Sequence, residues 1–354
     1  MSPHPLIERA RDREVRQASR FRDAAEKLAG EGLRKEWEEE VASAPRRHQA
    51  GKRYLAPRKR PPARLGDAQS QLALALLRHA ADPARGLLLP DRSSVQLVGC
   101  RVPLRAAPPD PQHADDPNRG IGEIDLLGLS DTGRLSLIGL AHVEPDAARA
   151  GTGETPLHAL LEGLASAAVA WANRDALRQE IADAVARELG DEAPLLLLLG
   201  APRYWELCRR RSAQKGAAWI HQMDRLAREI EAGVGVRVQY LALEPVPVAL
   251  DAEGWPALAA APRIAPAWDE FAGRVRPKPP PRPKPRKEPE ETIVAGDPSR
   301  PVRSYAMSER YEAGDRVAHP LFGEGVVQGP AGPGKIKVRF EGQPRVLVHE
   351  RLAR

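Results

Sequence analysis

The sequence predicts an α/β protein in which helices flank a mixed central sheet, followed by a separate small β-barrel. Three observations lead to this class. Between residues 67 and 244, the patterns run in the order helix, three strands, helix, strand, helix, strand. Residues 311–354 carry short alternating segments with closely spaced glycines. Two basic, proline-rich tracts separate these parts from each other and from the N-terminus.

The composition favours two domains with linkers. The chain has 354 residues, 35 prolines, 29 glycines and a net charge of +6. Cys100 and Cys208 have no metal or disulfide spacing and fit a reducing compartment. The N-terminus has no secretory apolar segment, and the longest apolar run, Leu195–Leu199, is too short for a membrane span. We therefore expect a cytoplasmic protein without membrane contact.

Residues 1–44 predict a charged helical arm. Charges of both signs surround apolar residues at helical spacing from Val15 to Val41. Gly30 and Gly32 are expected to divide the arm into two helices. The pattern fits a solvated arm that packs one thin stripe, or alternatively a helix that binds a partner.

Residues 45–66 predict a basic, proline-rich linker. Eight Lys and Arg residues occur within residues 45–64, without an acidic residue. Such a segment can neutralise phosphates by counterion release without recognising a base sequence. A flexible linker without a ligand is the alternative. The candidate contacts are Arg46, Arg47, Lys52, Arg53, Arg58, Lys59 and Arg60.

The α/β domain is predicted to cover residues 67–270. It begins with an apolar-rich helix, Asp67–Ala80, in which Asp67 is the expected N-cap. Alternating or continuous apolar segments then predict a strand and a hairpin, with the Asp131-Thr132-Gly133 turn in the hairpin. The three strands are Val95–Leu104, Gly122–Leu127 and Leu135–Val143.

The second half of this domain alternates helices and strands. A long helix is expected to start near Thr155-Pro156, with Thr155 as the capping residue and proline at the first helical position, and to continue to Leu189. The unbroken leucines of Pro194–Gly200 predict a strand buried on both faces. A helix over residues 215–232 and a strand at Val236–Leu243 complete the domain.

The C-terminal part is predicted to be a small five-stranded barrel over residues 305–354. A proline-rich and basic spacer, residues 271–304, precedes it. Residues 335–340 alternate strictly, with apolar residues on one face and Lys335, Lys337 and Arg339 on the other. Together with Arg316, these cations are candidates to face phosphates or an acidic protein surface. A merely solvated face is the alternative.

Residues 67–244 resemble the PD-(D/E)XK nuclease superfamily, which has the restriction-endonuclease-like fold. In that family an aspartate on the second strand, and an acid and a lysine two residues apart on the third, bind a divalent metal and activate water. Asp125 matches the first position, and Glu123 shares its strand face. Where the family has its acid and lysine, this chain has Gly139 and Ala141.

Neighbouring residues offer limited replacement for the missing groups. His142 and Glu144 have the wrong strand parity unless a bulge re-aims them. His158 and Glu162 lie on the following helix and can bring a ligand to the site. The resemblance thus leaves an inactive relative, or a rearranged Mg²⁺- or Mn²⁺-dependent nuclease using Asp125 with Glu123 or Glu162. An unrelated α/β domain is the third reading.

The C-terminal part is similar to the Tudor/SH3-like domain of UvrD/PcrA-type DNA helicases and to the polymerase-interacting domain of CarD-type transcription factors. Gly314-Asp315-Arg316-Val317, His319-Pro320 and residues 322–327 carry this resemblance. It implies docking on RNA polymerase or on nearby nucleic acid.

The sequence therefore favours a non-catalytic binding protein associated with DNA, transcription or repair. Its predicted partners are DNA and, through the C-terminal module, RNA polymerase or another protein. No cofactor is expected outside the nuclease alternative. A scaffold that binds only protein is the remaining alternative.

Overall fold

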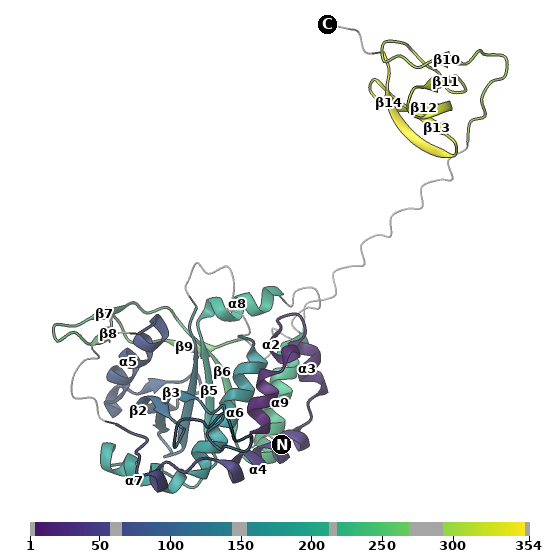
Figure 1. The fold of residues 1–354 in the computed structure, drawn as a ribbon. Coiled ribbons are helices and arrows are strands. Elements are labelled where there is room, and N and C mark those ends of the chain that lie inside the picture. Colours follow the sequence, from purple (N-terminus) through teal and green to yellow (C-terminus); the bar gives the residue numbers. More distant parts are fainter. Residues whose placement is uncertain (1–3, 57–65, 144–153, 212–217, 269–292, 351–354) are drawn as a thin grey trace. The chain divides into compact units, whose positions relative to one another are not determined.

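A computed structural model describes residues 4–56, 66–143, 154–211, 218–268 and 293–350. The chain divides into two compact units, Met1–Arg276 and Pro277–Arg354 (Figure 1). Among the helices of the described ranges, none combines the length and apolar character that crossing a bilayer requires.

The described part of the larger unit contains a seven-stranded mixed sheet, which confirms the predicted α/β class. Its central strands form an antiparallel meander followed by parallel strands, and short antiparallel strands pair at both edges. In sheet order the strands are β1 (Leu87–Leu88), β2 (Ser94–Pro103), β3 (Glu123–Ser130), β4 (Leu135–Ala141), β5 (Leu195–Gly200), β6 (Arg237–Leu243) and β9 (Ile264–Pro266).

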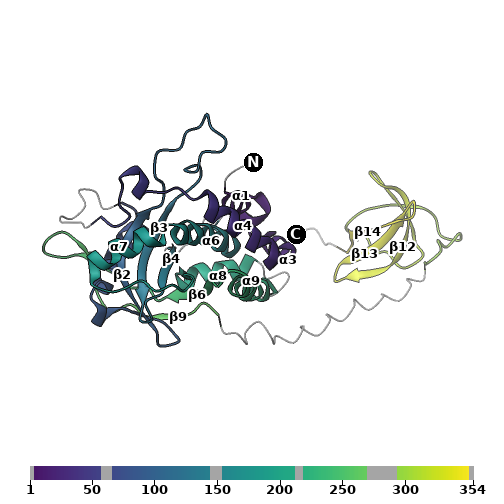
Figure 2. The same cartoon turned by 90° about the horizontal axis from the view of Figure 1, so that it is seen from below.

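Helices cover both faces of this sheet (Figures 1 and 2). On β5, Leu196 and Leu198 belong to one apolar cluster, while Leu195, Leu197 and Leu199 belong to a second. Since successive strand residues point to opposite faces, the two clusters lie on the two sides of the sheet. The continuous leucine run therefore forms a strand buried on both faces, as predicted.

One face is covered by α5 (Ala68–Ala80) and the other mainly by α6 (Pro156–Ala172) and α9 (Ala218–Val234). Both predicted N-caps are confirmed. The Asp67 carboxylate accepts from the Ser70 amide at 2.8 Å, and the Thr155 hydroxyl accepts from the His158 amide at 3.1 Å.

The prediction of one helix from Thr155 to Leu189 is wrong. It divides at Asn173 into α6 and α7 (Arg174–Val185). The Asn173 side-chain amide donates to the Val169 carbonyl at 2.8 Å and to the Pro45 carbonyl at 3.0 Å. A side chain that hydrogen-bonds nearby backbone competes with the helix, and this one also fixes a distant segment at the junction.

The N-terminal residues also differ from the prediction. They form α1 (Pro5–Arg11), α2 (Arg13–Arg16), α3 (Phe21–Lys27) and α4 (Gly30–Ser43). Both glycines lie inside α4, and the Gly30 amide donates to Glu229 of α9 at 2.9 Å. Phe21 is buried against Trp219 at 5.5 Å between ring centroids. The expected solvated arm is therefore part of the larger unit's core.

Several short elements were not predicted. Among them are the 3₁₀ turns His48–Ala50 and Pro83–Arg85. The helix α8 (Pro202–Arg211) follows directly after β5 and contains the buried Trp205 and Cys208. A hairpin of β7 (Val248–Leu250) and β8 (Pro256–Leu258) packs on α5.

The described part of the second unit is a five-stranded sheet, as predicted. Its strands are β10 (Arg303–Ser304), β11 (Arg316–His319), β12 (Gly323–Gly332), β13 (Lys335–Phe340) and β14 (Gln343–Val348). The Tyr305 hydroxyl donates to the Val348 carbonyl at 2.5 Å, and this bond brings the first and last strands together. The sheet is therefore nearly closed.

The predicted C-terminal boundary of the spacer, residue 304, is wrong. Residues 293–304 pack on the second unit, where the Val294 amide donates to the Gln328 side chain at 2.9 Å. Residues 269–292 lie outside the described residues.

Candidate functional site

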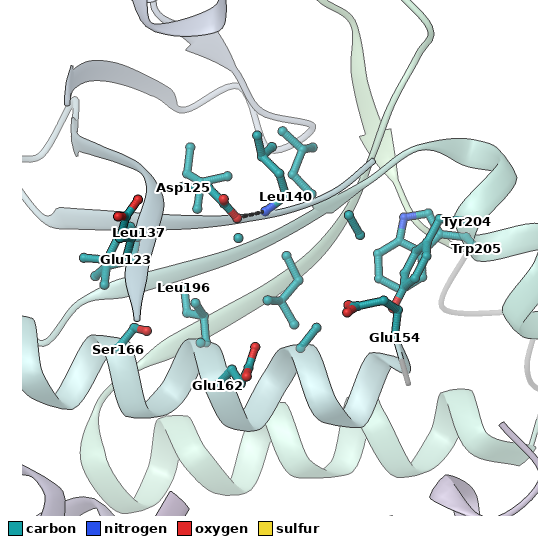
Figure 3. Close-up of a pocket in the computed structure, with 18 residues that line it drawn as sticks. Glu123, Asp125, Leu137, Leu140, Glu154, Glu162, Ser166, Leu196, Tyr204 and Trp205 are labelled. Carbon is teal, nitrogen blue, oxygen red and sulfur yellow. Dashed lines mark hydrogen bonds between the residues drawn. The ribbon is translucent and has the colours of Figure 1, made fainter. Parts of the chain in front are cut away.

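A pocket of about 120 Å³ lies where β3 and β4 face α6 (Figure 3). The acids that line it are Glu123, Asp125, Glu154 and Glu162. The pocket includes the three candidate catalytic residues, and Glu154 joins them from the residues before α6. Among its described lining residues no side chain carries a positive charge.

Asp125 completes the hydrogen bonding of two diverging strands. The β3–β4 pairing ends at Leu126 and Ile138. Beyond that pair, the Leu140 amide donates to Asp125 Oδ2 at 2.8 Å (Figure 3). Gln69 Nε2 donates to Oδ1 at 3.2 Å. The carboxylate thus takes the place of a strand carbonyl, and both of its oxygens are engaged.

Burial raises the pKa of Asp125, and the hydrogen bonds from Leu140 and Gln69 only partly oppose that rise. A raised pKa is a feature of many functional carboxyls, but structural groups show it as well. Here the desolvation follows from the position of the carboxyl between a helix and the sheet.

The other two candidate acids have separate partners. Glu123 pairs with Arg101 at 3.1 Å, and Glu162, whose side chain is 55% exposed, pairs with His158 at 3.4 Å. Across the described ranges, no three His, Cys, Asp or Glu side chains form a group that could hold one metal ion. The candidate ligands therefore line one pocket without forming such a group.

Gly139 and Ala141, which were expected to match the acid and lysine positions of the nuclease pattern, also line the pocket. A Cβ atom on Gly139 would meet only Leu198, at an ordinary contact distance of 3.6 Å. A side chain is thus sterically acceptable there. His142 instead lines a different groove, next to the ends of β4–β6, and Glu144 lies outside the described residues.

His158 and Tyr204 also lie near the pocket. His158 has a structural hydrogen-bond partner, whereas the Tyr204 hydroxyl has none among the described residues. His158 Nδ1 lies 2.9 Å from the Ala10 carbonyl, which ties α6 to α1. The buried Tyr204 hydroxyl has no hydrogen-bond partner of good geometry among the described residues. Burial, with smaller effects of Cys208 and Glu154, raises the Tyr204 pKa well above 10, so this phenol stays neutral. Nothing in the sequence marks Tyr204 as a functional residue beyond its place after a buried strand.

The described cations of the basic tract contact this unit itself. Arg46 donates to the Ala172 carbonyl, Arg47 to the Arg53 and Arg105 carbonyls, and Lys52 to the Ala106 carbonyl at 2.8 Å. Arg58, Lys59 and Arg60 lie outside the described residues.

Glu180 of α7, which the sequence did not single out, organises this tract. Its buried carboxylate accepts from the Tyr54 amide at 2.9 Å and the Leu55 amide at 2.7 Å, and it contacts His48 Nε2 at 2.5 Å. Burial alone would raise the Glu180 pKa, but the hydrogen bonds from Leu55, Tyr54 and His48 outweigh it and lower that pKa.

In the second unit, β13 alternates as predicted. Ile336, Val338 and Phe340 are buried, and the cations between them are on the opposite face. Lys337 and Arg339 line a hollow of about 450 Å³ with Gln328 and Pro344. Arg316 on β11 pairs with Glu324 at 3.6 Å and is not part of this hollow.

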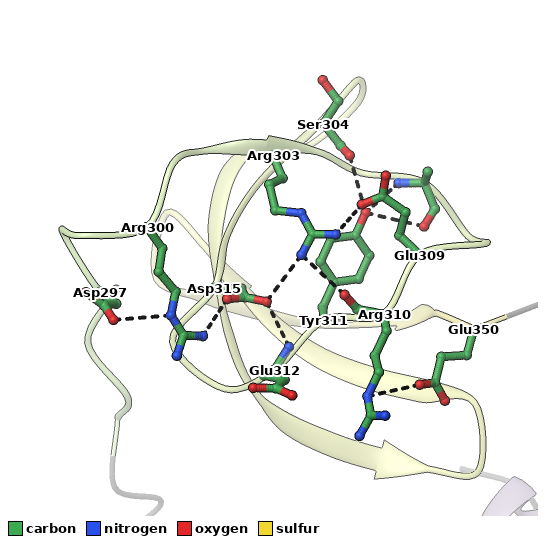
Figure 4. Close-up of polar contacts among 11 residues, drawn as sticks. Asp297, Arg300, Arg303, Ser304, Glu309, Arg310, Tyr311, Glu312, Asp315 and Glu350 are labelled. Carbon is green, nitrogen blue, oxygen red and sulfur yellow. Dashed lines mark hydrogen bonds and ion pairs between the residues drawn. The ribbon is translucent and has the colours of Figure 1, made fainter.

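Asp315, in the Gly314-Asp315-Arg316-Val317 segment, has a structural role in the second unit (Figure 4). It is buried and accepts from Arg300 at 2.7 Å and from the Glu312 amide at 2.9 Å. Burial opposes ionisation, but the Glu312 amide and the cations Arg300 and Arg303 lower the Asp315 pKa. The network attaches residues 297–303 to the start of β11.

Comparisons with protein-family models, curated proteins and solved structures found no significant match to this chain.

Proposed function

We propose that the chain binds nucleic acid without cutting it and that the outer face of β13 is a principal contact. The observation that carries the proposal is the row of Lys335, Lys337 and Arg339 on one face of that strand. Two-residue steps along a strand separate neighbouring cations by about 6.8 Å. Such a row can contact successive phosphates and release their counterions.

The resemblance of the C-terminal module to Tudor-like domains of DNA helicases and CarD-type factors supports the same proposal. It adds a role in transcription or repair, with RNA polymerase as a second partner. The larger unit is then a restriction-endonuclease-like scaffold with a degenerate active site. The ladder-completing role of Asp125 supports this assignment, since both oxygens already have partners.

The test compares salt-dependent DNA binding of the full chain with that of a charge variant, Lys335→Gln/Lys337→Gln/Arg339→Gln. Its matched control, Lys27→Gln/Arg34→Gln/Lys35→Gln, removes as many exposed cations from α3 and α4. Binding is measured by fluorescence anisotropy over a salt series. The β13 variant is expected to lower the slope of log K against log salt by up to about 2.7, at about 0.9 per phosphate contact.

Equal slopes for the β13 variant, the control and the parent would contradict the proposal. Absence of salt-dependent binding by the parent would favour the scaffold that binds only protein. Capture of purified RNA polymerase by the full chain, lost in a chain ending before residue 293, would support the polymerase contact.

A second candidate, a metal-dependent nuclease, is favoured by one observation: four acids line the same pocket. Incubation of the parent with plasmid and Mg²⁺ or Mn²⁺, beside Asp125→Asn and Glu162→Gln, tests it. Cleavage by the parent that both variants lose would replace the non-catalytic proposal with this one.

A further inference from the structure

A second groove, of about 840 Å³, lies in the larger unit at the β1–β2 side of the sheet. Its walls come from β2, α5, α7, the segment before residue 57 and Trp255 between β7 and β8. In the described residues β1 pairs with only Ser94 and Val95 of β2, so the rest of this strand has no partner on its outer side.

This strand edge is unsuited to pairing with another strand. A bulge interrupts β2 between Leu97 and Gly99, and Arg101 has φ of 50° in the left-handed region. Bulges and irregular backbone prevent an added strand from forming a regular ladder. A ligand in this groove must therefore be recognised by side chains.

Arginines reach the groove from separate parts of the chain: Arg47, Arg53, Arg78 and Arg101. Arg47 donates to the Arg53 and Arg105 carbonyls, and among the described residues no carboxylate lies within ion-pair distance of it. Burial lowers the pKa of Arg47, and the nearby Tyr54 and Glu180 only partly oppose this. An anion in the groove would stabilise this guanidinium.

Two of the other arginines form exposed ion pairs. Arg53, 59% exposed, lies 3.4 Å from Asp183 and also 3.6 Å from the buried Glu180, and Arg101, 49% exposed, lies 3.1 Å from Glu123. Such pairs add little to stability because water competes with them. A phosphate can replace the carboxylate at small cost, particularly at the 3.4 Å contact.

The groove also has an apolar side. Trp255 is partly buried against α5, and the Arg78 guanidinium lies 5.3 Å from its ring centroid. The Asp251 carboxylate fixes this corner, since it accepts from the Trp255 amide at 2.8 Å and pairs with Arg78 at 2.6 Å. Leu74 and Leu77 of α5 line the same side. An indole beside cations is the combination on which unpaired bases stack.

We propose that this groove binds a single-stranded segment of nucleic acid, with phosphates on Arg47, Arg53 and Arg101 and a base on Trp255. The inference rests on the proposed function and specifies the form of nucleic acid that the larger unit accepts. A duplex keeps its bases stacked inside, so it cannot present one to a recessed indole. The proposed site includes three residues that the sequence analysis did not select: Arg78, Arg101 and Trp255.

The experiment uses the full chain and two fluorescein-labelled probes, an oligo(dT) and a duplex of the same length. The groove variant is Arg53→Gln/Trp255→Leu. The matched control is Arg174→Gln/Trp171→Leu, which also removes one exposed arginine and one partly buried tryptophan; there the guanidinium lies 4.7 Å from the indole centroid, outside the groove. Arg53→Gln alone serves as a milder variant, since the Arg53 side chain is 59% exposed and the indole stays in place.

The groove variant is expected to bind oligo(dT) about tenfold more weakly or worse, while the control binds like the parent. Arg53→Gln alone should give a smaller loss in the same direction, and duplex binding should not change. Unchanged oligo(dT) binding, or an equal loss on both probes, overturns the inference.

The two proposals fail separately. If the β13 variant loses DNA but the groove variant does not, only the groove assignment is wrong. If the groove variant loses oligo(dT) while the β13 variant binds like the parent, the β13 contact is wrong and the groove stands. A parent that binds neither probe contradicts both.

Discussion

Replacement of Asp125 by alanine is expected to destabilise the larger unit by about 1–3 kcal/mol, the cost of a buried polar group without a partner. The Leu140 amide lies beyond the last β3–β4 pair, and Asp125 is its acceptor at 2.8 Å. Gln69 loses a weaker bond at 3.2 Å and is only partly buried, so water can replace that partner. The amide therefore dominates the loss.

Asparagine at the same position separates the hydrogen bond from the charge. Its side-chain oxygen can still accept from Leu140, so Asp125→Asn should stay within about 1 kcal/mol of the parent at neutral pH. Glu162→Ala is the control from the same pocket, and since its side chain is 55% exposed it should change stability by less than about 0.5 kcal/mol.

The raised pKa of Asp125 gives a pH signature with a definite sign. A carboxyl whose folded-state pKa exceeds its ordinary 3.8 binds its proton more tightly in the folded state. The cost of its buried charge is therefore present at neutral pH and disappears as pH falls through the folded-state pKa towards 3.8. The parent should gain stability relative to Asp125→Asn over that interval.

Urea denaturation followed by tryptophan fluorescence measures these differences, because all six tryptophans lie between positions 37 and 268 and report on the larger unit. The reasoning is refuted if Asp125→Ala is as stable as the parent or more stable. Removal of a strained functional carboxylate often increases stability, so that result would favour the nuclease alternative.

Two further predictions use the same denaturation assay. Glu180→Ala should destabilise the larger unit by about 3–5 kcal/mol, because the buried Tyr54 amide loses its acceptor and a buried charged network is broken. Asp183→Ala on the same helix is the control and should cost less than about 1 kcal/mol. Similar losses for the two variants would refute the organising role of Glu180. In the buried His4–Glu40 pair, burial raises the Glu40 pKa. Burial alone would lower the His4 pKa, but the hydrogen bonds to Glu40 and Pro117 and the charges of Glu40 and Asp116 together outweigh it and raise that pKa. Stability should thus fall as pH rises from 4.5 through the folded-state pKa of His4, above 6.5, and the replacement of both by leucine should flatten that slope.

Features set by neighbouring residues were predictable from the sequence. The N-caps Asp67 and Thr155 depend on a bond to an amide three residues away. The leucine run of β5 is apolar at every position, which only a strand covered on both faces requires. The order of the five longer strands along the chain followed from these local signals.

Features set by distant contacts were not predictable. The division of α6 from α7 depends on Asn173 meeting the Pro45 carbonyl. The charged N-terminal segment was expected to be solvated, but Phe21 packs on Trp219, nearly 200 residues later. The structural role of Glu180 could not be predicted for the same reason, since a glutamate on a helix ordinarily faces water.

The candidate site divides in the same way. The place of Asp125 on β3 was predictable, but its acceptor role depends on where β3 and β4 stop pairing. The groove could not be predicted, because Arg53, Arg101 and Trp255 are separated by long stretches of chain and meet only in the fold.

The distribution of charge supports the proposal that the chain binds nucleic acid without cutting it. The pocket at Asp125 is lined by acids and, among its described lining residues, by no cation, so a phosphate is repelled there. The groove at Trp255 carries four arginines beside Glu180 and Asp183, and the outer face of β13 carries two lysines and an arginine. Under the proposal, a nucleic acid strand contacts either set of cations and avoids the pocket at Asp125. Lysine at position 141 would change that balance, since it adds a cation to the pocket where the nuclease superfamily carries one.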